Sequence, residues 1–252
     1  MGISHQSLVM LSCLFILLCF VPWYLRNSSI AVWRLLVLQL CFFVLYFVGI
    51  KVLSLAMRDW QLMQPLVLEL SSGRRASGGI AALLVGMPLL IMWLLPRGQR
   101  LMYVDAAALA APLAYAVVRL TCYLNGCCTG DLCDHSYCIT YPRFSGVFME
   151  QLKAGQVAYF DARSRPVFPL HLFVMGANLM IFIGLLWFAP RKHYAGQLFL
   201  LCLLLSEGSK AVLESFREPY LPTLQFVAAA LAGLGLLGLM LITRRRCATA
   251  LE

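Results

Sequence analysis

Several ionisable side chains lie within or beside long apolar stretches of this chain, where a charge is costly and therefore points toward function. Three of them are positively charged and lie near the ends of two such stretches: Arg119, Lys210 and Arg217. Glu214 lies between Lys210 and Arg217, and His171 lies at the start of a third stretch. The planar fork of arginine matches phosphate oxygens bidentately, and lysine adds a point charge. These residues therefore predict a site that binds a phosphate group at a membrane surface.

The same charges also admit a purely structural interpretation. Glu207, Lys210, Glu214 and Arg217 are spaced by three or four residues, so one helix would present them on a single face. Such a face would line a water-filled cavity, or it would form ion pairs that hold helices together. The same two interpretations apply to Asp105. The surplus of cations favours the phosphate site.

Cysteines form a second group with chemical potential. Ten are present, and five of them lie within residues 122–138: Cys122, Cys127, Cys128, Cys133 and Cys138. Their spacing lacks the paired C-x2-C of common zinc sites. Disulfides are favoured if the segment faces an oxidising compartment, with structural thiols and a metal or catalytic thiol as the alternatives. The spacing does not determine which cysteines pair.

The elements that must position these residues are transmembrane helices. Of the 252 residues, 62% are hydrophobic and 12% charged, with a mean hydropathy of +0.82. This composition excludes a soluble globule, a disordered chain and a collagen-like repeat. A span needs about 20 apolar residues. Seven stretches qualify: Leu8–Leu25, Ala31–Leu55, Gly79–Leu95, Met102–Leu124, Phe168–Ala189, Gln197–Leu213 and Pro222–Ile242.

Charge placement predicts the orientation, because short loops rich in Lys and Arg stay cytoplasmic. Basic residues occupy every second loop and the segment after the last stretch: Arg26, Arg34, Arg97, Arg100, Arg191, Lys192 and Arg244–Arg246. We therefore expect an all-α integral membrane protein with seven spans, its N-terminus outside and its C-terminus cytoplasmic. Residues 1–252 would form one membrane domain, and residues 125–167 a small extracytoplasmic head between spans four and five. The net charge of +9 is then a topology signal, and no nucleic-acid partner is expected.

Four motifs resemble those of the prolipoprotein diacylglyceryl transferase family. Arg119-Leu-Thr-Cys-Tyr-Leu-Asn125-Gly126-Cys-Cys-Thr-Gly130 resembles its signature of Arg, then Asn-Gly six and seven residues later, then a closing Gly. Ser77-Gly78-Gly79 is similar to its His-Gly-Gly element, and Phe168-Pro169-Leu-His171-Leu172 to its Pro-x-Gln-Leu-Tyr-Glu opening of a later span. Lys210-Ala-Val-Leu-Glu214-Ser-Phe216-Arg217-Glu-Pro219 is similar to its Arg-Phe-x-x-Glu-Phe-Phe-Arg-x-Pro ending.

The resemblance implies an activity and a set of site residues. The family moves the diacylglyceryl group of phosphatidylglycerol onto the thiol of a lipobox cysteine in the bacterial inner membrane, releasing glycerol phosphate. Arg119 and Arg217 match its arginines, Lys210 replaces a third, and Glu214 would orient an arginine. The implied substrate-binding residues are Asn125, Gly126, Gly130, Ser77, Gly78 and Gly79. No metal and no organic cofactor is expected.

This chain also departs from the family pattern. Ser77 stands where the family has a histidine, so His171 becomes the candidate base. We expect a transferase that uses an anionic phospholipid, with a prolipoprotein or another acceptor as its second partner. Two alternatives stay open. One is a lipid-binding or transport protein that has lost the chemistry, and the other is a thiol–disulfide or metal-handling protein centred on the cysteines.

Overall fold

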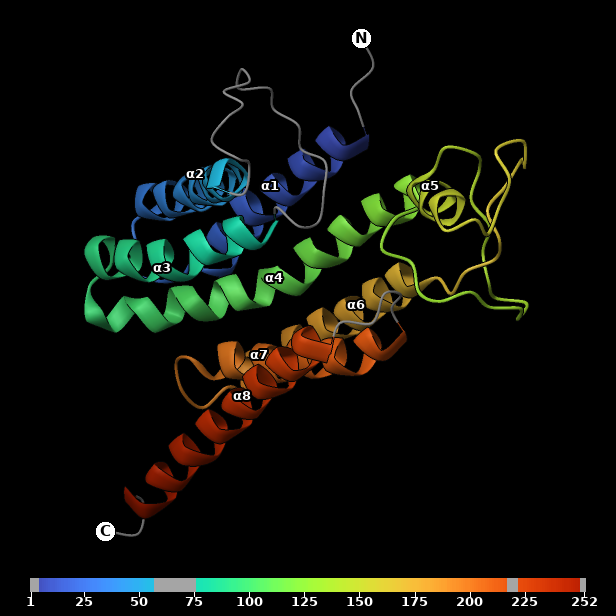
Figure 1. The fold of residues 1–252 in the computed structure, drawn as a ribbon. Helices are drawn as coiled ribbons and strands as arrows, with labels where there is room; N and C mark the ends of the chain where they lie inside the picture. Colours follow the sequence, from blue (N-terminus) through green and yellow to red (C-terminus); the bar gives the residue numbers. More distant parts are fainter. Residues whose placement is uncertain (1–4, 57–75, 217–221, 250–252) are drawn as a thin grey trace. The chain divides into compact units, whose positions relative to one another are not determined.

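Helices make up nearly all of the regular structure. The computed structural model describes residues 5–56, 76–216 and 222–249 (Figure 1). The helices in these ranges are α1 His5–Tyr24, α2 Val32–Ala56, α3 Ala76–Leu94, α4 Arg97–Asn125, α5 Gly146–Lys153, α6 Leu170–Phe188, η1 Ala189–Arg191, α7 Gln197–Leu213, η2 Glu214–Phe216 and α8 Pro222–Thr249. Extended structure in the same ranges is limited to isolated β-bridges.

The predicted all-α fold is confirmed for the described residues, since each of the seven apolar stretches lies largely in a helix. Four of these helices are long and apolar enough to cross a membrane, over Val32–Gly49, Arg97–Asn125, Leu170–Arg191 and Gln225–Ile242. Shorter apolar helices cover Phe15–Tyr24 and Ala82–Leu94. The chain is therefore a multi-pass membrane protein, while seven crossings and the orientation stay predictions.

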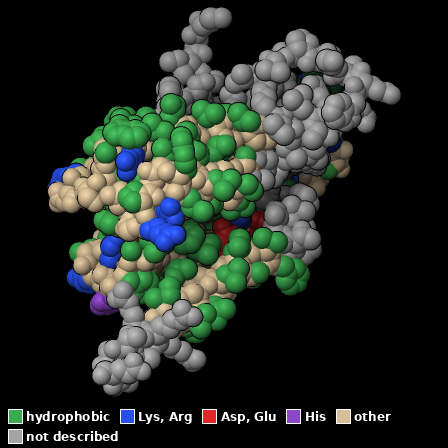
Figure 2. Space-filling model, turned by 90° about the vertical axis from the view of Figure 1, so that its left-hand side faces the viewer, with side chains coloured by type: hydrophobic (Ala, Val, Ile, Leu, Met, Phe, Trp, Pro, Cys, Tyr) green, Lys and Arg blue, Asp and Glu red, His purple; other side chains and the backbone are tan. Residues whose placement is uncertain are grey.

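Large apolar side chains on the helices point outward. Trp93, Phe226, Leu84 and Met180 are 71–81% exposed. Figure 2 shows hydrophobic side chains covering much of one face of the described structure. Lipid tails solvate such a surface better than water does, which agrees with helices embedded in a bilayer.

The chain divides into two compact units, of which one comprises Leu18–Tyr103. Within it α2 packs along α3 (Figure 1). A Cβ on Gly79 would lie 2.5 Å from Cδ2 of Tyr46, and one on Gly86 would lie 2.7 Å from Cδ1 of Leu45. Glycine at these two positions lets the helices approach closely, as small residues do in membrane helix pairs. Gly79 thus has a packing role, whatever its part in substrate binding.

The other unit comprises Met1–Leu17 and Val104–Glu252. Within it α6 packs on α7 and α7 on α8. Gly235 of α8 faces the backbone of α7, because a Cβ there would lie 3.0 Å from the carbonyl oxygen of Leu200. This helix pair therefore also relies on a small residue for close contact.

Asp105 of α4 holds the start of α7. It is fully buried, and its carboxylate accepts hydrogen bonds from the backbone N–H of Gly196 (2.9 Å) and of Phe199 (3.1 Å). It also pairs with Lys192 Nζ at 3.1 Å. Gly196 has φ 92°, a left-handed conformation that glycine adopts without strain. Asp105 thus caps a helix N-terminus from a distant part of the chain, which confirms the structural interpretation for this residue.

Residues 126–169, between α4 and α6, form a compact segment around α5. Its small core contains Tyr141, Val147 and Val167, with Leu132 and Ile139 packed against them. Ser145 caps the N-terminus of α5, and its hydroxyl accepts a hydrogen bond from the backbone N–H of Phe148 at 3.3 Å. This segment corresponds to the predicted head, whose extracytoplasmic location stays a prediction.

Candidate functional site

The last turns of α4 position Arg119. Its guanidinium lies over the ring of Tyr115, 4.7 Å from the centroid, and one Nη donates a hydrogen bond to the Tyr115 hydroxyl. The other Nη lies 4.0 Å from Sγ of Cys122. The Nε–H is buried, and no hydrogen-bond acceptor in the described part of the chain reaches it. Arg119 is thus held in place, with one buried donor that no described protein group satisfies.

The turn that follows α4 folds back toward the core of the segment. The backbone N–H of Cys127 donates to the carbonyl of Cys122 at 3.0 Å, and the carbonyl of Gly126 accepts from Val147 at 2.7 Å. Gly126 has φ 58°, and a Cβ there would lie 2.7 Å from the ring of Tyr141. Asn125, the last residue of α4, is partly buried beside this turn. Glycine at 126 is therefore required by both its backbone conformation and its space.

Gly130 joins the turn to the start of α6. Its N–H donates to the carbonyl of Phe168 at 2.9 Å, and the N–H of Phe168 donates to the carbonyl of Asp131 at 2.9 Å. A Cβ on Gly130 would collide with the carbonyl oxygen of Phe216 in η2. The rings of Phe168 and Phe216 stack with centroids 5.5 Å apart. Gly130 therefore permits three segments of the chain to meet at one point.

His171, at the start of α6, faces this turn. It is fully buried, its Nε2 lies 2.8 Å from the hydroxyl of Tyr141, and the ring of Tyr123 lies 5.5 Å away. Its Nδ1 has no hydrogen-bond partner among the described residues. Electrostatic interactions connect His171 with Arg119 and with Cys128. The signature residues Arg119, Gly126 and Gly130 and the candidate base His171 are thus gathered around one turn.

Tyr141 supports His171 from the core of the segment. Burial and the neighbouring Tyr123 raise the pKa of the Tyr141 phenol above its ordinary value, so the group stays neutral. A neutral phenol can donate to Nε2 or accept from it, which keeps either tautomer of the ring in place.

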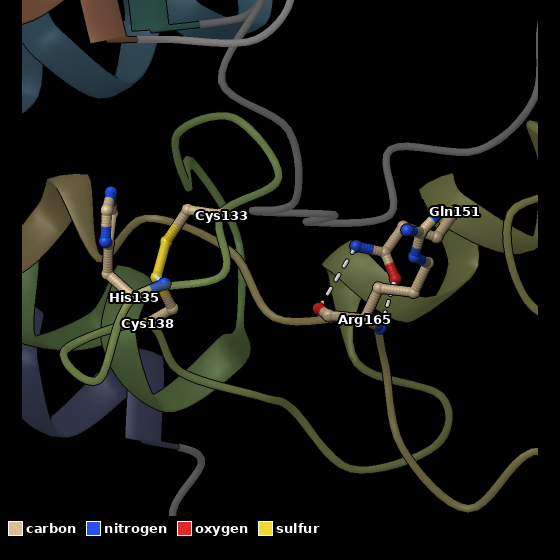
Figure 3. The surroundings of a disulfide bond; sticks show 5 residues. All are labelled: Cys133, His135, Cys138, Gln151 and Arg165. Atoms are coloured by element: carbon tan, nitrogen blue, oxygen red, sulfur yellow. Dashed lines mark hydrogen bonds between the residues drawn. A yellow bond between two sulfur atoms is a disulfide. The ribbon is translucent and has the colours of Figure 1, made fainter.

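The cysteines separate into two kinds. Cys133 and Cys138 form a disulfide, and Figure 3 shows it beside His135, whose backbone N–H donates to Sγ of Cys138. The predicted disulfide in this segment is confirmed for that pair. Figure 3 also shows Gln151 of α5 joined to the backbone of Arg165 by two hydrogen bonds, of which the one from the Arg165 N–H is 2.8 Å long.

The other cysteines of the group carry thiols. The sulfurs of Cys122, Cys127 and Cys128 all lie within 4.8 Å of one another, and each side chain is partly exposed. Cys128 has φ 55°, so two left-handed residues, Gly126 and Cys128, flank Cys127. The spacing along the chain did not reveal that these three sulfurs converge.

The described residues of the predicted polar face differ in their exposure. Lys210 and Glu207 form an ion pair at 3.4 Å on α7. The α-helix ends at Leu213, and Glu214 begins the 3₁₀-turn η2, where it is buried while Lys210 is exposed. The backbone N–H of Glu214 still donates to the carbonyl of Lys210, so Glu214 keeps its helical spacing at the end of α7. Arg217 lies outside the described residues.

Three predicted residues belong to the other compact unit. Ser77, Gly78 and Gly79 are in the first turn of α3, in the unit Leu18–Tyr103. Sequence reasoning also missed two residues of the site, Tyr115 and Tyr141. Tyr115 precedes Arg119 by four residues, a spacing that predicts contact on one helix face. Tyr141 has no such signal, because it meets His171 from 30 residues away.

Comparison with known proteins identifies the family of this chain. A family model described as prolipoprotein diacylglyceryl transferase matches residues 44–243, a range that runs from α2 into α8 and includes every candidate site residue. A search of curated proteins finds no significant match. Since the matched range covers most of the chain, the protein belongs to the prolipoprotein diacylglyceryl transferase family, a family of transferases.

Proposed function

We propose that this protein transfers the diacylglyceryl group of phosphatidylglycerol to the thiol of a prolipoprotein cysteine and releases glycerol phosphate. The observation that carries the proposal is the partly buried Arg119, which lies over Tyr115 and beside Cys122 while its buried Nε–H has no acceptor among the described residues. Such a donor, held at a fixed position in a site of low dielectric, suits a phosphate ester.

The reaction needs a group that stabilises the leaving phosphate. A sulfur–carbon bond forms at the diacylglyceryl carbon that carries the phosphate, and the carbon–oxygen bond breaks. The electron pair leaves with glycerol phosphate, whose charge rises from one to two negative units as the diester becomes a monoester. Arg119 interacts more strongly with the product charge than with the substrate charge, which lowers the barrier.

The second need is a thiolate. His171 is buried, and its Nδ1 has no hydrogen-bond partner among the described residues. In the tautomer with Nε2–H donating to Tyr141, Nδ1 accepts a proton from the acceptor thiol. Asn125, Gly126 and Gly130 would shape the surface around the headgroup. Lys210, Glu214 and Arg217 complete the proposed set, with Glu214 orienting an arginine.

We further propose seven spans, with the N-terminus outside, the C-terminus cytoplasmic, and the Asn125–Val167 segment on the outer face of a bacterial inner membrane. The disulfide Cys133–Cys138 supports this placement, because disulfides persist in oxidising compartments. The basic pair Arg191 and Lys192 follows the opposite end of α6 from His171. Basic loops of this kind stay cytoplasmic.

The activity is tested with the purified full-length protein, phosphatidylglycerol and a peptide that contains a lipobox cysteine. We expect mass spectrometry to detect a diacylglyceryl thioether on the peptide and an equal amount of glycerol phosphate. A peptide with serine in place of cysteine serves as the control. Binding of phosphatidylglycerol without turnover would contradict the transferase and favour the lipid-binding alternative.

The role of Tyr141 gives a further prediction. Tyr141→Phe keeps the ring against Gly126 and removes the hydroxyl that holds His171. We expect kcat for transfer to fall by roughly three- to tenfold, the loss of one hydrogen bond, with little change in KM. The pH dependence of kcat would shift because the histidine loses its partner. An unchanged kcat and pH profile would show that the hydroxyl has no positioning role.

A further inference from the structure

Cys122, Cys127 and Cys128 form a thiol cluster at the end of α4. Their sulfurs lie within 4.8 Å of one another, although five and six residues separate Cys122 from the other two. The hydrogen bond from Cys127 N–H to the Cys122 carbonyl brings the chain back on itself. Positive φ values at Gly126 and Cys128 complete the turn. A strained φ at a non-glycine residue persists where the surrounding structure requires it, as at functional sites.

The sulfur separations suit a single metal ion. Sulfur ligands at about 2.3 Å from tetrahedral Zn²⁺ lie roughly 3.8 Å apart, so small side-chain rotations would bring this cluster to coordination distance. Three protein ligands leave a fourth position for another molecule, which is the pattern of catalytic zinc sites. The partial exposure of all three cysteines leaves that position accessible.

The charge around the thiol cluster also suits a metal thiolate. Zn²⁺ with three thiolates carries one net negative charge, and the guanidinium of Arg119 lies 4.0 Å from Sγ of Cys122. An adjacent arginine stabilises thiolate over thiol. The nearby disulfide joins Cys133 to Cys138 and leaves the three sulfurs of the thiol cluster outside any disulfide.

We propose that Cys122, Cys127 and Cys128 bind one Zn²⁺ whose fourth position takes the sulfur of the acceptor thiol. The second part rests on the proposed transferase function, while the zinc site stands independently of it. The bound zinc would give this chain a way to form the thiolate of the acceptor, although Ser77 occupies the position of the family's histidine.

The chemical step then balances. The acceptor thiol loses its proton when its sulfur binds zinc, and His171 or water takes that proton. The bound sulfur attacks the diacylglyceryl carbon, the carbon–oxygen bond breaks, and glycerol phosphate leaves with the electron pair beside Arg119. The product is a neutral thioether, a weaker ligand than a thiolate, so it leaves the metal.

The first test measures metal without measuring activity. We expect the full-length protein, purified in detergent without chelators, to contain about one zinc per chain. We expect Cys127→Ser to lose the zinc and Cys19→Ala, which removes an exposed cysteine of α1, to keep it. Zinc retained by Cys127→Ser, or a zinc-free protein with a disulfide within the thiol cluster, would overturn the proposal.

A second measurement uses the unaltered chain, in case Cys127→Ser does not fold. Alkylation followed by mass spectrometry should show Cys122, Cys127 and Cys128 protected, and a zinc chelator should make them reactive. Equal labelling before and after chelation would contradict the zinc site. Because neither measurement involves transfer, a chain that binds zinc but fails to turn over phosphatidylglycerol would count against the transferase alone.

The acceptor position is tested by spectroscopy. After replacement of zinc by Co²⁺, a lipobox peptide with cysteine should shift the sulfur-to-cobalt absorption bands, and the matched serine peptide should not. Identical spectra with both peptides would overturn the assignment of the fourth position to the acceptor thiol.

Discussion

Arg119→Ala is expected to lower the rate of diacylglyceryl transfer by about 100- to 1,000-fold, the loss found when one preorganised donor to a developing negative charge is removed. The guanidinium is placed by its contacts with Tyr115 and Cys122, while its Nε–H has no protein acceptor among the described residues. Initial rates with phosphatidylglycerol and a lipobox peptide measure the effect. Arg119→Lys should give an intermediate rate, because it keeps the charge and loses the fork.

The matched control is Arg191→Ala. Arg191 also lies over an aromatic ring, 4.1 Å from the centroid of Trp187, and it also donates to a nearby group, the Trp187 carbonyl. It follows the other end of α6 from His171. We expect its replacement to leave transfer within about twofold, since exposed charges of this kind contribute little. Equal rate losses in Arg119→Ala and Arg191→Ala would remove the basis for the phosphate site.

The sequence predicted the helices well because a bilayer leaves the backbone few choices. Apolar segments in lipid must satisfy their own hydrogen bonds, so hydropathy identifies helices directly. The predicted stretch Gln197–Leu213 coincides with α7. The short helix α5 was not predicted, because it lies in a polar segment where hydropathy carries no signal. Its capping residue Ser145 was the available local indication.

Site residues could be predicted where they belong to one continuous motif. They could not be predicted where only folding brings them together. Arg119 and Gly126 belong to one continuous signature, and one turn holds them together. The contact between Tyr141 and His171 joins distant residues and has no periodicity. The polar face was predicted from helical spacing, which does not reveal that Glu214 is buried while Lys210 is exposed. The convergence of three thiols likewise depends on the backbone conformation of the turn.

Asp105→Ala is expected to destabilise the protein by about 2–4 kcal/mol. The replacement removes the acceptor of two backbone N–H groups, those of Gly196 and Phe199, and each buried donor left unsatisfied costs about 1–3 kcal/mol. The start of α7 also loses a negative charge that its dipole favours. Unfolding in detergent by heat or denaturant measures the change. Asp105→Asn should give a smaller loss, because its amide oxygen still accepts a hydrogen bond.

The control separates the helix cap from the ion pair. The Lys192 side chain is 26% exposed while that of Asp105 is fully buried, so water can solvate the lysine once its partner is gone. We therefore expect Lys192→Ala to change the free energy of unfolding by less than about 1 kcal/mol. If Lys192→Ala were as destabilising as Asp105→Ala, the ion pair would hold this end of the unit together. A large effect of Asp105→Ala alone would show that an aspartate in an apolar stretch serves here as a distant helix cap, which is why charge in a span does not by itself identify a substrate site.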